Sequence, residues 1–200
     1  GFNKGDAKIT FGTGSFLLFN TGKNVVYSQK GLLSTVAWKL KKQSSVFALE
    51  GGAFVCGAAV QWLRDGLQLF EKSGDVEALA RQVPDTEGVE FVLALSGLGA
   101  PYWKPEARGQ ITGLTRGSTK AHMARATLEA MALQNVDILE TMRADAKIKL
   151  SKVRVDGGAT ANHLLMQLQS DYLGIPVELP HNIETTSAGA ALVAGLGAGV

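Results

Sequence analysis

The stretch VRVDGGATANHLLMQLQSDYLG, residues 153–174, contains the transition that decides the fold. It starts with an alternating pattern typical of a strand, which ends at Asp156, Gly157 and Gly158. An amphipathic helical pattern follows at once, and Gly174 ends it. A strand joined to a helix by glycines predicts an α/β domain with this turn at the carboxyl edge of the sheet.

The same turn is a candidate binding site. A helix N-terminus offers N–H groups to a phosphate, and glycines let a flat base or a sugar approach the backbone. Asn162 lies one turn further on, where its amide can both donate and accept, as an adenine edge requires. A plain helix start capped by Asp156 or Asn162 explains the same residues equally well. The local pattern therefore leaves a binding site and a helix cap open at Gly158 and Asn162.

Around this turn the chain reads as strands first and then as helices alternating with strands. A meander of strands is predicted up to residue 52, and a helical spacing follows over 53–69. The second half predicts a long helix ending near Arg143, a strand at 175–180 and a last helix rich in small residues. We therefore predict one domain, residues 1–200, with a mixed sheet flanked by helices.

The composition excludes several classes of protein. The charges of the 200 residues nearly cancel, at a net +2, so nothing predicts a nucleic-acid partner. No apolar run has the length of a membrane span, so no membrane partner is expected. Cys56 is the single cysteine, which excludes a disulfide framework and fits a reducing compartment such as the cytoplasm. The histidines, His122, His163 and His181, are too scattered to predict a metal site.

Gly12-Thr13-Gly14 lies between two predicted strands and is a second candidate site. Backbone N–H groups in such a turn can face an anion, with the Thr13 hydroxyl as a further donor. The motif alone favours a hairpin turn without a ligand. The chain contains no P-loop, and Gly14 leads into a strand, so the Rossmann fingerprint does not apply either.

Gly57 and Gln61 form a third candidate, because residues four apart share one face of a helix. A glycine inside a helix costs roughly 1 kcal/mol relative to alanine. A close contact is therefore expected at Gly57, either with another part of the protein or with a ligand. Packing within the protein is the simpler explanation when this helix is considered by itself.

Several long motifs together resemble the glycerol kinases of the FGGY carbohydrate-kinase family. The loop GLGAPYWKPEARG, residues 97–109, resembles a glycerol kinase loop, and GQITGLTRGSTKAHMARATLE, residues 109–129, matches the family's second signature along its whole length. The motifs KITFGTGSF, ALEGGAFVCGAAVQWLRD and VDGGATANHLLMQLQSD fit the same family in the same order. The resemblance covers essentially the whole chain.

The resemblance implies more than the periodicity does. It implies the C-terminal domain of a two-domain kinase, with an actin-like ATPase (ribonuclease H-like) fold built on a mixed five-stranded sheet. ATP, with Mg²⁺, would bind in the cleft between the domains. Thr13 would contact the phosphates, Gly57 and Gln61 would lie along the nucleotide, and Gly158 and Asn162 would hold its adenosine part.

The resemblance also implies what the chain lacks. The family's catalytic base is an aspartate in a Gly-Asp-Gln stretch, and no Asp-Gln occurs here. No catalytic or metal-binding residue is therefore assigned, and the N-terminal domain with the start of this domain is expected upstream. Phe16 would face the polyol pocket. Lys104 stands where many members carry an acid, from which we infer no altered activity.

The implied activity is ATP-dependent phosphorylation of glycerol to sn-glycerol 3-phosphate by a full-length cytoplasmic enzyme, with this fragment alone inactive. The family also implies a homodimer or a homotetramer. Three alternatives stay open: an FGGY kinase for another polyol or sugar, a non-catalytic nucleotide-binding module, and a purely structural or interaction domain that binds no nucleotide.

Overall fold

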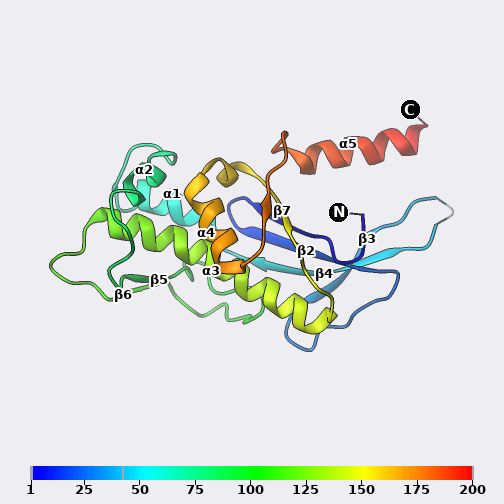
Figure 1. Ribbon diagram of the computed structural model, residues 1–200, viewed down its shortest axis with the longest axis horizontal. Helices are drawn as coiled ribbons and strands as arrows, with labels where there is room; N and C mark the ends of the chain where they lie inside the picture. Colours follow the sequence, from blue (N-terminus) through cyan, green and yellow to red (C-terminus); the bar gives the residue numbers. More distant parts are fainter. Residues whose placement is uncertain (1, 42, 200) are drawn as a thin grey trace.

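A computed structural model describes residues 2–41 and 43–199 of the chain (Figure 1). The main sheet is mixed and has six strands in the order β3-β4-β2-β1-β7-β8. These strands are β1 Ala7–Phe11, β2 Ser15–Gly22, β3 Leu33–Trp38, β4 Val46–Ala53, β7 Val153–Asp156 and β8 Val177–Glu178. A separate two-stranded sheet holds β5 Glu90–Val92 and β6 Gln110–Thr112.

Five helices and one 3₁₀ turn accompany the sheets in the described residues. They are α1 Gly57–Asp65, α2 Asp75–Ala80, α3 Lys120–Ala146, the 3₁₀ turn Gly158–Ala161, α4 His163–Leu173 and α5 Thr185–Ala198. The predicted mixed sheet flanked by helices is confirmed, and so is the order of strands first and helices later. The predicted long helix runs three residues beyond Arg143.

The expectation of a five-stranded sheet is wrong, because the sheet has six strands. The shortest is β8, whose two residues pair in parallel with β7 at the edge of the sheet. Pro176 and Pro180 lie on either side of it, and proline has no N–H to donate to a ladder. Pro176 contributes only its carbonyl, which accepts the N–H of Val153 at 3.0 Å. The chain therefore adds a strand here, but a very short one.

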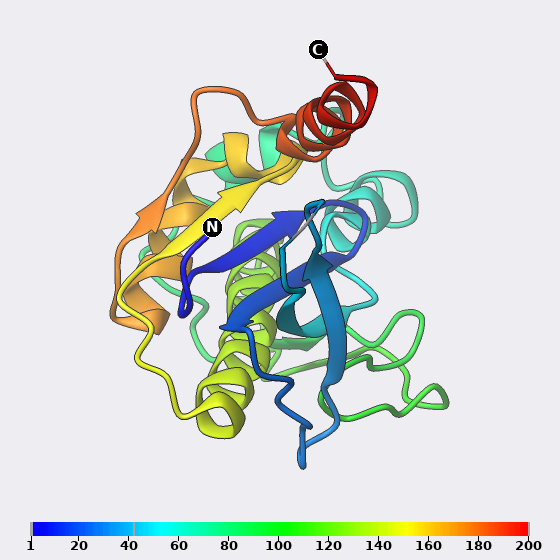
Figure 2. The same cartoon turned by 90° about the vertical axis from the view of Figure 1, so that its right-hand side faces the viewer.

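The strands alternate between a buried and a more open face. In β1, Ile9 and Phe11 are buried, and in β2, Leu17 and Phe19 are buried as well. Helix α3 packs against β2 and β4, and α4 packs against α3 (Figure 2). The alternate apolar positions of the strands thus face the helices and form the core, as the period of two requires.

A chain of buried polar side chains crosses this core. The Ser15 hydroxyl donates to Asn135 Oδ1 at 2.6 Å, and Asn135 Nδ2 donates to Gln169 Oε1 at 3.0 Å. Gln169 Nε2 in turn donates to the carbonyl of Ala132 at 3.3 Å. These bonds join β2, α3 and α4, which explains why a polar residue interrupts the apolar stripe of α3.

Helix α5 lies apart from the other helices, near the C-terminal end of the chain (Figure 1). Its apolar residues Leu192, Val193 and Leu196 are exposed, and none of its described residues is buried. At 14 residues it is shorter than the roughly 20 that a bilayer requires. Across residues 2–41 and 43–199, no helix is both long and apolar enough to cross a membrane.

We predict that Cys56, just before α1, resists alkylation in the folded chain. The side chain is 1% exposed, and burial raises the pKa of its thiol to about 12. Because the thiolate is the reactive form, iodoacetamide at about pH 8 should label Cys56 only after denaturation. Mass spectrometry after timed labelling, with and without denaturant, measures the difference. Rapid labelling of the folded chain would contradict this environment.

Candidate functional site

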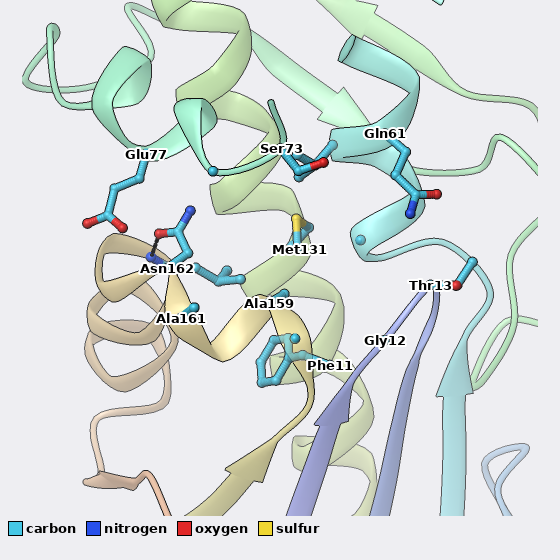
Figure 3. A pocket seen from close by; sticks show the side chains of 15 residues that line it. Phe11, Gly12, Thr13, Gln61, Ser73, Glu77, Met131, Ala159, Ala161 and Asn162 are labelled. Atoms are coloured by element: carbon cyan, nitrogen blue, oxygen red, sulfur yellow. Dashed lines mark hydrogen bonds between the residues drawn. The ribbon is translucent and has the colours of Figure 1, made fainter. Parts of the chain in front are cut away.

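A pocket of about 330 Å³ lies where the β1–β2 turn, α1, α2 and the turn after β7 meet (Figure 3). All five positions expected to contact a nucleotide line it, namely Thr13, Gly57, Gln61, Gly158 and Asn162. The structure therefore brings together three candidate sites that lie far apart in the sequence. A cavity of this size lies within the range of small-molecule sites.

The Gly-Thr-Gly segment forms the predicted hairpin turn, and its carbonyls cap α1. The Thr13 carbonyl accepts the N–H groups of Cys56 at 2.8 Å and Ala58 at 3.0 Å, and the Gly12 carbonyl accepts that of Gly57 at 3.0 Å. The first N–H groups of α1 are thus used within the protein. Thr13 itself is exposed at the tip of the turn and faces the pocket (Figure 3).

Gly57 is explained by a contact within the protein. A Cβ at this position would lie 2.7 Å from the carbonyl oxygen of Gly12. The close approach is between the helix and the β1–β2 turn, so packing, the simpler of the two explanations, accounts for this glycine. Gln61, one turn later, is exposed and points into the pocket (Figure 3).

The two glycines after β7 have different roles. Gly157 has φ +93° and ψ 164°, a conformation that is essentially restricted to glycine. A Cβ there would lie 2.3 Å from the carbonyl oxygen of Phe11. At Gly158, by contrast, a Cβ would find no atom within 4 Å. Gly157 is therefore required by its backbone conformation and by its close contact with Phe11, whereas Gly158 leaves open space beside the pocket.

The N-terminus of α4 is occupied by side chains of the protein. Asn162 Oδ1 accepts the N–H of Leu165 at 2.9 Å, which confirms the helix-cap interpretation for Asn162. Glu77 of α2 accepts the N–H groups of His163 at 3.0 Å and Leu164 at 3.2 Å. The expectation of N–H groups free for a phosphate is therefore wrong for these two groups of α4, because a carboxylate of the protein already holds them.

Glu77 is a lining residue that the sequence did not predict. Burial opposes its charged form, but the Arg81 guanidinium and the two amides of α4 outweigh that effect and lower the pKa of the Glu77 carboxyl. Among the described residues that line the pocket, Glu77 is the only charged one, and no lysine or arginine joins it. No local pattern marks it, because its partners on α4 are more than 80 residues away.

One interpretation expected Asp156 to cap the following helix, but it does not do so. It is buried, and Lys8 Nζ lies 2.6 Å from its Oδ2. The Thr185 hydroxyl at the start of α5 donates to the same oxygen. Burial opposes ionisation, but hydrogen bonds from Lys8, Thr185 and Thr10 outweigh it and lower the pKa of Asp156. The residue therefore ties β7 to β1 and α5.

Phe16, expected at the polyol site, does not line this pocket. It lies on β2 opposite Thr10 and Gly52, and its side chain is 60% exposed. No group of three His, Cys, Asp or Glu side chains in the described part of the chain could hold a metal ion. His122 instead closes the first turn of α3, where its Nδ1 accepts the N–H of Thr119 at 3.0 Å.

The aromatic loop over residues 97–109 is tied back to the domain. The Tyr102 hydroxyl donates to Asp137 of α3 at 2.8 Å, and Trp103 Nε1 donates to the carbonyl of Gly31. Tyr102 and Trp103 remain about half exposed. These contacts fit an ordered surface loop held by its aromatic side chains.

A family model described as the C-terminal domain of the FGGY family of carbohydrate kinases matches residues 7–198. The chain belongs to the FGGY family. It is 71% identical over 199 residues to a glycerol kinase of Bdellovibrio bacteriovorus, and 57% identical over 198 residues to one of Carboxydothermus hydrogenoformans. These matches cover 100% and 99% of this chain, but only 40% and 39% of the relatives. This FGGY chain thus spans about two fifths of the length of the curated relatives it matches.

Solved structures confirm the FGGY fold. A crystal structure of Plasmodium falciparum glycerol kinase with ADP matches with a TM-score of 0.90 and 40% identity, over 98% of this chain and 39% of that one. Gluconate kinase from Lactobacillus acidophilus matches with a TM-score of 0.82 at 21% identity, over the same shares of the two chains, and shows the fold alone. The expected actin-like ATPase fold of the FGGY kinases is therefore confirmed.

Proposed function

We propose that this chain is the nucleotide-binding C-terminal part of an ATP-dependent glycerol kinase. The observation that carries the proposal is the meeting of Thr13, Gly57, Gln61, Gly158 and Asn162 around one pocket. The relatives named glycerol kinase match this chain along its whole length, and one solved relative is a glycerol kinase with ADP. The remaining part of the enzyme, including an N-terminal domain, is proposed to supply the other wall of the site.

The residues of the pocket suit different parts of a nucleotide. Thr13 sits at the tip of a tight turn, where its hydroxyl would donate to a phosphate oxygen. Gln61 would lie along the nucleotide from the exposed side of α1. The open space beside Gly158 would admit the flat adenosine part. Asn162 Oδ1 is used by α4, so its Nδ2 group would be the donor to the ligand.

The chemistry proposed for the whole enzyme is a phosphoryl transfer to a hydroxyl. A bond forms between the glycerol oxygen and the γ-phosphorus, and the bond from that phosphorus to the β–γ bridging oxygen breaks. The hydroxyl proton passes to a carboxylate, and ADP leaves with the bonding electron pair. We place this carboxylate, an aspartate by family resemblance, outside the present chain, and we propose that Phe16 faces the polyol.

The described residues do not fit a resident Mg²⁺ site, since they offer no cluster of acidic ligands. Mg²⁺ in kinases is bound through substrate phosphates and one or two carboxylates, with several waters. We therefore propose that the nucleotide enters as its Mg²⁺ complex and that the protein ligands lie outside this chain.

The test is coupled ADP release by the full-length kinase with ATP, Mg²⁺ and a panel of polyols and sugars, with the 200-residue chain as the control. We expect selective turnover of glycerol by the full-length protein and none by the chain alone. Turnover of another acceptor instead would reassign the substrate. Nucleotide binding without any turnover would favour a non-catalytic module, and glycerol phosphorylation by the isolated chain would refute the division of labour.

A cytoplasmic location and a homodimer or homotetramer complete the proposal. The buried, unpaired Cys56 is compatible with a reducing compartment. Light scattering of the full-length protein would measure its mass, and a monomer at micromolar concentration would contradict the expected assembly.

A further inference from the structure

The end of the pocket opposite Thr13 is formed by α2 and α4. Glu77 and Asn162 lie there beside each other (Figure 3). The Glu77 side chain is 20% exposed, so its carboxylate is largely enclosed by the protein. If a nucleotide has its phosphates at Thr13, its base lies at this end.

The two oxygens of Glu77 are used unequally. Oε1 accepts from Arg81 Nε at 2.9 Å, from Arg81 Nη2 at 2.7 Å and from the N–H of Leu164 at 3.2 Å. Oε2 accepts one hydrogen bond within the described part of the chain, from the N–H of His163 at 3.0 Å. A carboxylate oxygen has about two acceptor positions. Oε2 therefore keeps one for a ligand, whereas Oε1 is saturated.

Asn162 supplies the complementary group. Its Oδ1 accepts the N–H of Leu165 at 2.9 Å, which orients the side chain and leaves the Nδ2 donors for the pocket. An acceptor next to a donor matches adenine, which presents an amino group beside a ring nitrogen. Guanine and hypoxanthine carry a carbonyl oxygen in place of that amino group, and this oxygen would face a carboxylate.

We propose that Glu77 is a specificity-determining residue that selects adenine nucleotides. Glu77 Oε2 accepts the exocyclic amino group of the base, and Asn162 Nδ2 donates to the neighbouring ring nitrogen. Because this inference rests on the proposed function, its test must separate loss of nucleotide binding from loss of base selection. A hydrogen bond to an ionised group is expected to change the selectivity by about tenfold or more.

The test compares kcat/KM for ATP and inosine triphosphate in the full-length kinase and in its Glu77→Gln variant. The glutamine keeps one oxygen for the N–H groups of α4 but presents an amide donor. We expect the preference for ATP to fall at least about tenfold, chiefly through KM. Asp75→Asn is the matched control, because Asp75 is a carboxylate on the same helix that does not line the pocket. We expect this control to keep the wild-type preference.

The other outcomes are distinct. An equal loss of activity with both nucleotides in Glu77→Gln would show a structural role only and would overturn the inference. An unchanged preference would overturn it as well. Failure of the wild-type protein to bind ADP in calorimetry would instead overturn the proposed function. If the variant does not fold, purine riboside triphosphate, which lacks the amino group, is tested on the wild type, and turnover equal to that of ATP would refute the role of Glu77.

Discussion

Replacing Gly157 with alanine is expected to destabilise the fold by about 3 kcal/mol or more. The backbone of Gly157, with φ +93° and ψ 164°, lies in a region that other residues avoid. The added methyl would also lie 2.3 Å from the Phe11 carbonyl oxygen and 2.8 Å from its carbonyl carbon. Neither atom can move without shifting β1. Thermal unfolding followed by circular dichroism should therefore show a fall of roughly 6–12 °C in Tm.

The adjacent glycine provides a matched control for this prediction. Gly158→Ala places the same methyl one residue further on, where no atom lies within 4 Å. We expect its Tm to stay within about 2 °C of the wild type. Since Gly158 lines the pocket, the bulkier Gly158→Val change should weaken ADP binding in calorimetry. Equal stability losses for the two alanine variants would contradict the separate roles of these glycines.

Replacing Asn135 with alanine is expected to cost about 2–4 kcal/mol of folding free energy. The change removes the acceptor of the Ser15 hydroxyl and the donor to Gln169, and all three side chains are buried. Buried polar groups without partners cost about 1–3 kcal/mol each. Urea denaturation should show a lower midpoint with an unchanged m-value.

A double-mutant cycle identifies the cause of that loss. Asn135→Ala leaves the Ser15 hydroxyl without its acceptor. In a Ser15→Ala background this hydroxyl is absent, so that part of the loss cannot occur. Asn135→Ala should therefore cost about 1 kcal/mol less in this background than in the wild type. Strictly additive losses would show that the hydrogen bond contributes nothing and that only the volume of the side chain matters.

The sequence predicted the elements well where one periodicity dominates. The strands predicted at the start of the chain and the long helix predicted to end near Arg143 are confirmed. The short β8 limited the prediction of the sheet, because its two paired residues carry too little pattern to show whether a strand joins the ladder. This strand forms only because β7 lies beside it, and the sequence pattern of residues 177–178 does not show that neighbour.

The sequence also predicted only part of the candidate site. Glycines at turns mark positions where a backbone must bend or approach something closely, and both candidate turns line the pocket. The same motifs could not show what occupies the helix ends. Glu77 at the start of α4 and the Gly12 and Thr13 carbonyls at α1 come from distant segments, and only the folded chain shows that they use those N–H groups.

The capped start of α1 has a consequence for charge. Its leading N–H groups face carbonyls of the β1–β2 turn, and among the described residues that line the pocket no cation is present. An ATP molecule carries several negative charges, and no lysine or arginine among the described residues that line the pocket balances them. We therefore expect the chain alone to bind ADP only slightly more tightly than adenosine, with the Thr13 hydroxyl as the main contact to the phosphates. Tight binding of the nucleotide phosphates would then require positive charge from outside the present chain.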